Sequence, residues 1–238
     1  MSIGDAAKRL EVSVGTLRRW DESGKLRAVR KSPGGDRFYR EHDLDLFPND
    51  VFQSALEWAS ADPQNIPEIP TRTYSENSGV FQAKLGKFQT AIKDIPGIEE
   101  LFPLVVSISG EIGGNSFDHN LGQWPDKQGI FFAYDVDNRE VVLADRGVGI
   151  LATLKKALPN LINDQDALSE AFTNFISGRT NQSRGNGLKY VKEVVQKSLI
   201  SLRFQSGNAE LEIKRDSSDL NIKPAVQHLR GCLAYIKY

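Results

Sequence analysis

Three short stretches in the second half of the chain carry groups that could act together on one ligand. Glu111, Asn115 and His119 are four residues apart, so a helix would place a carboxylate, an amide and an imidazole on one face. Asp145-Arg-Gly147-Val-Gly149 follows an apolar strand-like run, and its glycines let the backbone pass close to a bound molecule. Arg184-Gly185-Asn186-Gly187-Leu188 opens a helix-like segment, where backbone N–H groups favour phosphate. The order and spacing of the three stretches indicate one site.

Together these stretches resemble the nucleotide site of the GHKL ATPase superfamily, which includes histidine kinases, anti-sigma kinases, DNA gyrase and MutL. The resemblance runs from about residue 80 to residue 238 and implies a Bergerat-type α/β two-layer sandwich with ATP and Mg²⁺ as cofactors. It implies Asn115 as the metal ligand, Glu111 as the catalytic residue that polarises water in hydrolysing members, and His119 near the phosphates. It also implies that Asp145 accepts a hydrogen bond from the adenine amino group. The ATP-binding residues so implied are Asn115, His119, Asp145, Gly147, Gly149, Gly185, Gly187 and Leu188.

Each stretch also has an ordinary structural explanation. The helical trio could be a solvated polar face, the aspartate stretch could be a plain strand-to-helix turn, and glycine-rich helix starts are common. Gly113-Gly114 inside the helix costs about 1 kcal/mol per glycine, which close approach to a ligand or strand would justify. The loop at 177–186 contains Ser177 to Ser183, which would form a mobile lid over the phosphates.

The first fifty residues carry a different pattern. Spacing of apolar residues predicts a helix over 3–10, then a turn and a second helix from Thr16, as in a helix-turn-helix. The loop at 31–36 reads as a hairpin tip, hence a wing. Between Arg18 and Arg40 lie eight basic residues against three acidic ones. This local excess of positive charge is typical of a face that contacts phosphate.

Residues 2–47 resemble the MerR-type winged helix-turn-helix, including its excisionase-like members. The matching text is Ile3-Gly-Asp-Ala-Ala7, Thr16-Leu-Arg-Arg-Trp20, Gly24-Lys-Leu26 and Pro33-Gly-Gly-Asp-Arg37-Phe-Tyr39. The resemblance implies that the second helix enters the major groove of double-stranded DNA while the wing contacts backbone or minor groove. Asp36 stands where many relatives carry His, and its carboxylate would repel phosphate. The expected DNA-binding residues are Thr16, Arg18, Arg19, Arg37 and Tyr39.

Composition and charge fit a globular chain of 238 residues with 39% hydrophobic and 26% charged content. We expect a DNA-binding domain at 1–48, a linker with a short helix at 49–79, and an ATP-binding domain at 80–238. The single cysteine, Cys232, excludes an internal disulfide and suits a small core residue. No apolar run reaches the roughly 18 residues of a membrane span, and no signal-peptide pattern is present, so we expect a cytoplasmic protein.

The second domain should contain both helices and hairpin-connected strands. Together they indicate an α+β fold, an α/β sandwich of two layers. The expected helices are 80–93, 99–121, 149–158, 165–176 and 187–197, and the expected strands are 129–135, 140–145, 199–205, 209–214 and 231–238.

Three functions remain open at this point. The first is a DNA-binding regulator controlled by ATP or ADP, and the second is an anti-sigma-like protein serine/threonine kinase acting on a separate partner protein. The third is a scaffold of a DNA-linked system with a vestigial nucleotide site, against which the retained motif residues argue. No histidine lies between Val51 and Gly110, where a histidine kinase would carry its phosphoacceptor helix. The sequence leaves open ATP hydrolysis, phosphoryl transfer and a homodimer.

Overall fold

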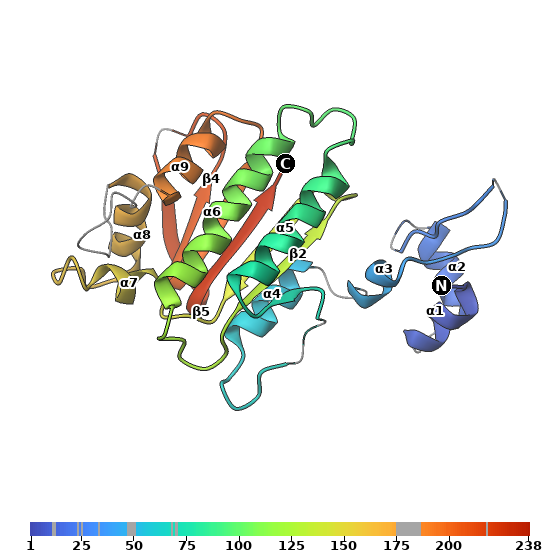
Figure 1. Cartoon of the computed structure of the whole chain (residues 1–238), viewed down its shortest axis with the longest axis horizontal. Helices are drawn as coiled ribbons and strands as arrows, with labels where there is room; N and C mark the ends of the chain where they lie inside the picture. Colours follow the sequence, from blue (N-terminus) through green and yellow to red (C-terminus); the bar gives the residue numbers. More distant parts are fainter. Residues whose placement is uncertain are drawn as a thin grey trace. The chain divides into compact units, whose positions relative to one another are not determined.

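The computed structural model consists of two compact units, Met1–Gln53 and Ser54–Tyr238 (Figure 1). It describes residues 1–10, 13–22, 24, 26–32, 34–46, 51–67, 69, 71–174, 187–217 and 219–238. None of the helices in these ranges is long and apolar enough to cross a membrane.

The first unit is built from three helices around a small apolar core. They are α1 (Ile3–Arg9), α2 (Val14–Glu22) and α3 (Glu41–Leu46). The Ser2 hydroxyl caps α1 by accepting the Asp5 N–H, which satisfies one of the donors that a helix start leaves unpaired. The expected wing consists of two extended segments joined by a bridge at Val29–Phe38. The core residues are Ala6, Ala7, Leu17, Leu26, Tyr39 and Leu44.

The second unit contains a five-stranded antiparallel sheet with the strand order β1-β2-β3-β5-β4. Helices and antiparallel strands together confirm the expected α+β class. The strands are β1 (Tyr74–Ser75), β2 (Ile130–Asp135), β3 (Glu140–Asp145), β4 (Ser201–Ile213) and β5 (Asn221–Lys237).

Three strands differ from the sequence-based expectation. The two-residue β1 lies within the expected linker and is too short to show a period of two. The expected pair 199–205 and 209–214 is one strand, β4, because a register irregularity around Gly207 bends the strand without ending it. The strand β5 begins ten residues earlier than expected, at Asn221 instead of 231, and pairs with β4 along this added length.

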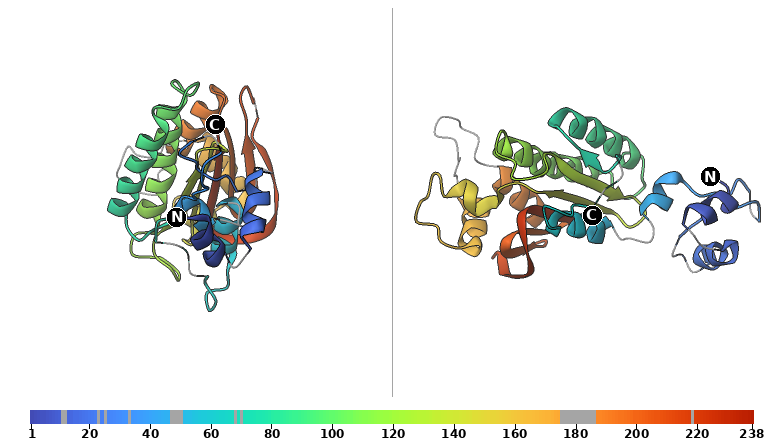
Figure 2. Two further views of the ribbon diagram at one scale, coloured as in Figure 1. Left: turned by 90° about the vertical axis from the view of Figure 1, so that its right-hand side faces the viewer. Right: turned by 90° about the horizontal axis from the view of Figure 1, so that it is seen from below.

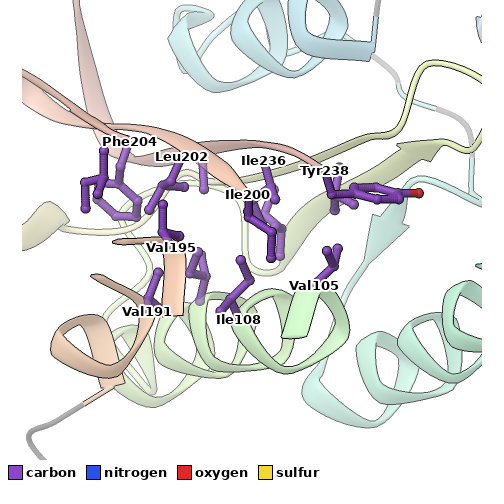
Figure 3. Close-up of a cluster of buried hydrophobic side chains, with 14 of the residues drawn as sticks. Val105, Ile108, Val191, Val195, Ile200, Leu202, Phe204, Ile236 and Tyr238 are labelled. Atoms are coloured by element: carbon purple, nitrogen blue, oxygen red, sulfur yellow. The ribbon is translucent and has the colours of Figure 1, made fainter. Parts of the chain in front are cut away.

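One face of the sheet is covered by α5 (Ser78–Ile92), α6 (Phe102–Asn120) and α9 (Gly187–Gln196) (Figures 1 and 2). Apolar side chains from α6 and α9 meet those of β4 and β5 in a continuous core, including Ile108, Val195 and Leu202 (Figure 3). The shorter helices α7 (Gly149–Leu154) and α8 (Asp164–Thr173) pack near β4. These positions agree with the expected helices to within a few residues, except that α7 ends at Leu154 and not at 158.

The other face of the sheet is partly covered by α4 (Val51–Ser60) (Figure 2). Phe131 and Phe132 are neighbours in β2, so their side chains point to opposite faces. The Phe132 ring lies 5.3 Å from that of Phe81 in α5, whereas the Phe131 ring lies 6.3 Å from that of Trp58 in α4. The helix expected inside a linker is therefore largely part of the second unit.

Candidate functional site

Asp145 ends β3 with its carboxylate buried, the residue being 3% exposed. It accepts hydrogen bonds from the Ser116 hydroxyl at 2.8 Å, from the Gly147 N–H at 2.8 Å and from the Cys232 N–H. Burial raises the pKa of Asp145 to about 6, although these three hydrogen bonds act in the opposite direction. Since Ser116 follows Asn115 on α6, the first two sequence stretches share a hydrogen bond.

The glycines after Asp145 allow a close approach between the loop and its neighbours. A Cβ on Gly147 would lie 2.1 Å from the Asn120 Nδ2, and Gly149 has a φ of 79° with a Cβ position 2.7 Å from the Arg230 carbonyl oxygen. The Asn120 side chain accepts the Val148 N–H at 2.8 Å and donates to the Ser116 carbonyl at 2.8 Å. Asn120 thus fixes the loop to the end of α6.

The third stretch meets the first one at the start of α9. A Cβ on Gly187 would lie 1.8 Å from Glu111 Oε1 and 2.9 Å from Asn115 Nδ2, so any larger residue would displace these side chains from their present positions. His119 lies one turn beyond Asn115 on α6 and is partly buried. Leu188 packs against the apolar core.

Some of the expected site cannot be placed. Gly185 and the expected lid at 177–183 lie outside the described residues. Within the described ranges, no group of three or more His, Cys, Asp or Glu side chains is arranged to hold a metal ion. That finding does not test Asn115, because Mg²⁺ bound with a nucleotide takes most of its ligands from phosphate and water.

A cavity of about 200 Å³ borders the glycine loop. The candidate cluster of Glu111, Asn115 and Asp145 does not line this cavity. Its lining residues are Val148, Gly149, Leu151, Ala152, Lys155, Asp164, Ser206, Gly207, His228 and Arg230.

Arg146, next to Asp145, connects the loop to α4. Its guanidinium donates to the carbonyls of Trp58 at 2.5 Å and Ala61 at 2.7 Å and to Asp126 at 2.7 Å, and the residue is 2% exposed. Burial alone would raise the pKa of Asp126, but the hydrogen bond from Arg146 and the charge of Arg230 hold it below its usual value. Arg146 thus connects the candidate site to the carboxyl end of α4, the helix within which the first unit ends in sequence.

Two of these residues were missed from the sequence. Asn120 and Arg146 act through partners 28 and 88 residues away, and no local pattern reports such contacts. The only available signal for Asn120 was its place on the polar helix face, four residues after Ser116.

In the first unit, Arg18 and Arg19 are exposed on α2, as a DNA-reading helix requires. Thr16 lies on the same helix, but its side chain is outside the described set. Arg37 instead donates to Asp21 at 2.6 Å, and Tyr39 is 1% exposed with its hydroxyl donating to the Leu17 carbonyl at 3.1 Å. DNA contacts by Arg37 and Tyr39 stay predictions. The internal bonds of both side chains and the burial of Tyr39 do not favour such contacts.

Comparison with known proteins identifies the class of the first unit. Residues 2–39 match the model of the MerR family regulatory proteins. No curated protein matches the chain. The chain therefore carries a MerR-family helix-turn-helix domain at its N-terminal end, joined to an α+β unit with an antiparallel sheet.

Proposed function

We propose that this DNA-binding regulator is controlled by ATP or ADP bound in a GHKL-type site of its second unit. DNA binding rests on the MerR-family match over residues 2–39. The nucleotide part rests above all on Asp145, a buried carboxylate with a raised pKa that shares Ser116 with the helix carrying Glu111 and Asn115. Asp145 accepts three hydrogen bonds within the protein, and since a carboxylate offers about four lone-pair sites, it can accept one more from a ligand.

Two glycines bring the backbone close to the residues of the proposed site. A Cβ on Gly231 would lie 2.3 Å from both the Asp145 Oδ1 and the Asp145 carbonyl oxygen, and a Cβ on Gly187 would meet the carboxylate of Glu111. In the proposed site Asp145 accepts from the adenine amino group and Asn115 is the protein ligand of Mg²⁺. Bound Mg²⁺-ATP would supply a transferable phosphoryl group. The placement of α5, α6 and α9 on one face of the sheet supports a Bergerat-type sandwich.

The second candidate function is an anti-sigma-like protein serine/threonine kinase acting on a separate partner. The observation that favours it is the position of Glu111, whose carboxylate lies beside Asn115 at the start of α9. A carboxylate there could polarise either water or a hydroxyl group of a protein. Release of free phosphate or labelling of a partner protein would separate the two functions.

Calorimetry with Mg²⁺-ATP tests the nucleotide site. We expect one molecule of nucleotide to bind per chain and Asp145→Asn to weaken binding about tenfold or more, the value of a hydrogen bond to a charged group. Asp137→Asn, an exposed carboxylate in the β2–β3 turn, is the matched control and should bind normally. Unchanged affinity in Asp145→Asn would remove this residue from the site, and no binding by the wild-type protein would reject the proposal.

A further inference from the structure

The carboxylate of Asp21 joins the reading helix to both segments of the wing. Asp21 is the penultimate residue of α2. It accepts the Ala28 N–H at 2.9 Å and the guanidinium of Arg30 at 2.6 Å on one segment. On the other segment it accepts the Arg37 Nε–H at 2.6 Å. A single side chain therefore holds three parts of the DNA-binding unit together.

The Asp21 carboxylate is largely buried against its partners and has little contact with solvent. Its side chain is 10% exposed. Burial would raise the pKa of Asp21, but the bonds from Ala28, Arg37 and Arg30 outweigh burial and lower it to about 2. The carboxylate is therefore charged at any pH at which DNA is bound. Its negative charge is matched by two guanidinium groups, which are the strong partners of a carboxylate.

The wing needs such an anchor because its own pairing is short. In the described part of the wing, the two segments are joined by the Val29–Phe38 bridge, with backbone hydrogen bonds of 2.7 and 2.9 Å in the two directions. A reading helix and a wing bind DNA together only if their separation fits the groove and the neighbouring backbone. Backbone pairing within the wing cannot set its angle to α2. The Tyr39 hydroxyl holds the end of the second segment to α2, and Asp21 adds bonds from α2 to both segments.

We propose that Asp21 is a positioning residue for DNA binding, which orients the wing against the reading helix through Arg30 and Arg37. This inference rests on DNA binding by the N-terminal unit. It reassigns Arg37 from a DNA contact to an internal partner of Asp21. We then expect exposed basic residues to contact the DNA phosphates, among them Arg18, Arg27 and Lys31.

Positioning and simple charge repulsion predict opposite changes in DNA affinity when the charge of Asp21 is removed. Removing a negative charge from a DNA-binding face should strengthen binding to phosphate if the charge only repels. Positioning predicts instead that Asp21→Asn weakens binding about tenfold or more, because it frees the wing. Glu22→Gln is the matched control, because this substitution removes the same negative charge. The side chain of Glu22 is 66% exposed, and its carboxylate lies 3.4 Å from the Arg37 guanidinium. This control should bind DNA as well as the wild-type protein or better.

Salt dependence separates the role of Arg37 from that of a phosphate contact. Affinity of the full-length protein is measured against salt concentration on a duplex enriched by the wild-type protein from a randomised pool. Loss of one phosphate contact reduces the slope of log K against log salt by roughly 0.9. We expect Lys31→Gln to reduce the slope by about this amount, and Arg37→Gln to lower affinity while leaving the slope unchanged.

Each outcome of these titrations decides a separate question. Failure of the wild-type protein to bind any duplex at low salt would reject DNA binding itself. Binding by the wild-type protein, with equal or tighter binding by Asp21→Asn, would overturn the positioning role alone. A reduced slope for Arg37→Gln would overturn it too, and this second test holds even if Asp21→Asn fails to fold.

Discussion

At Asp145 the protein keeps a carboxylate away from water with neutral donors as its named partners, a hydroxyl and two backbone N–H groups. Its pKa of about 6 in the folded protein exceeds the ordinary value of 3.8. The folded state therefore binds the proton more tightly than the unfolded state. Stability contributed by the neutral form is present below about pH 4 and is lost as the pH rises to about 6. We interpret this loss of stability as the cost of burying the carboxylate that we propose binds a ligand.

Asp145→Asn should remove this pH dependence. We expect the variant to gain stability over the wild-type protein as the pH rises from 4 to 7, by on the order of 2–3 kcal/mol at most. Denaturant unfolding followed by Trp58 and Trp124 fluorescence, both in the second unit, measures the difference. Equal destabilisation of the variant at every pH would mean that the carboxylate is a structural partner, not a strained functional group.

Individual residues differ in how well the sequence alone predicts their neighbours. Asp145, Asn115 and Gly187 were singled out by the order of their motifs, and residues of the three stretches lie near one another in the structure. Their roles in binding a nucleotide stay predictions. Asp21 and Arg146 were not singled out because their partners are set by tertiary contacts. The MerR resemblance places Arg37 in the wing and so predicts a DNA contact, but the sequence does not show that Arg37 bonds to Asp21.

Among the elements, α4 is the helix whose carboxyl end bonds to Arg146, the neighbour of Asp145. Its carboxyl end leaves backbone carbonyls without helical partners, and Arg146 donates to the carbonyls of Trp58, Ala59 and Ala61. The Arg146 guanidinium also lies 5.9 Å from the centre of the Trp58 ring. Arg146 therefore fixes α4 to the loop that follows β3.

Arg146→Met should release α4. Removing one partner of a buried ion pair leaves Asp126 and three carbonyls poorly satisfied, so we expect a loss of about 3 kcal/mol or more in the stability of the second unit. Amide exchange across residues 51–61 should become faster. Arg230→Met is the control, because Arg230 bonds to the same Asp126 but is a more exposed partner. Unchanged exchange across 51–61 in Arg146→Met would show that α4 is held by its apolar contacts alone.

Element positions were largely predictable where periodicity was strong. The helices α5, α6, α8 and α9 match expectation closely because apolar residues recur along each of them over several turns. The strands β2 and β3 match because each is a short, continuous apolar run bounded by turn residues. The position of α4 on the second face of the sheet was not predictable, since its apolar side chains do not identify the surface they cover. The strand β1 is recognised only through its pairing with β2.

For the whole molecule, two units in one chain raise the question of communication between them. The DNA-binding unit ends within α4 in sequence, and α4 is held at its other end by the residue next to Asp145. A nucleotide that shifts the loop after β3 would act on α4 through Arg146. We also predict that nucleotide binding creates or breaks a dimer contact. A dimer would place two reading helices on adjacent half-sites and so raise DNA affinity.

The most direct test of nucleotide control is one DNA titration run in three states: without nucleotide, with ADP, and with Mg²⁺ and a non-hydrolysable ATP analogue. Light scattering on the same samples gives the oligomeric state. We predict that the ATP analogue changes both DNA affinity and mass, and that Asn115→Ala abolishes both changes while keeping the binding seen without nucleotide. Identical curves and masses in all three states would contradict nucleotide control of DNA binding and would favour phosphorylation of a partner protein.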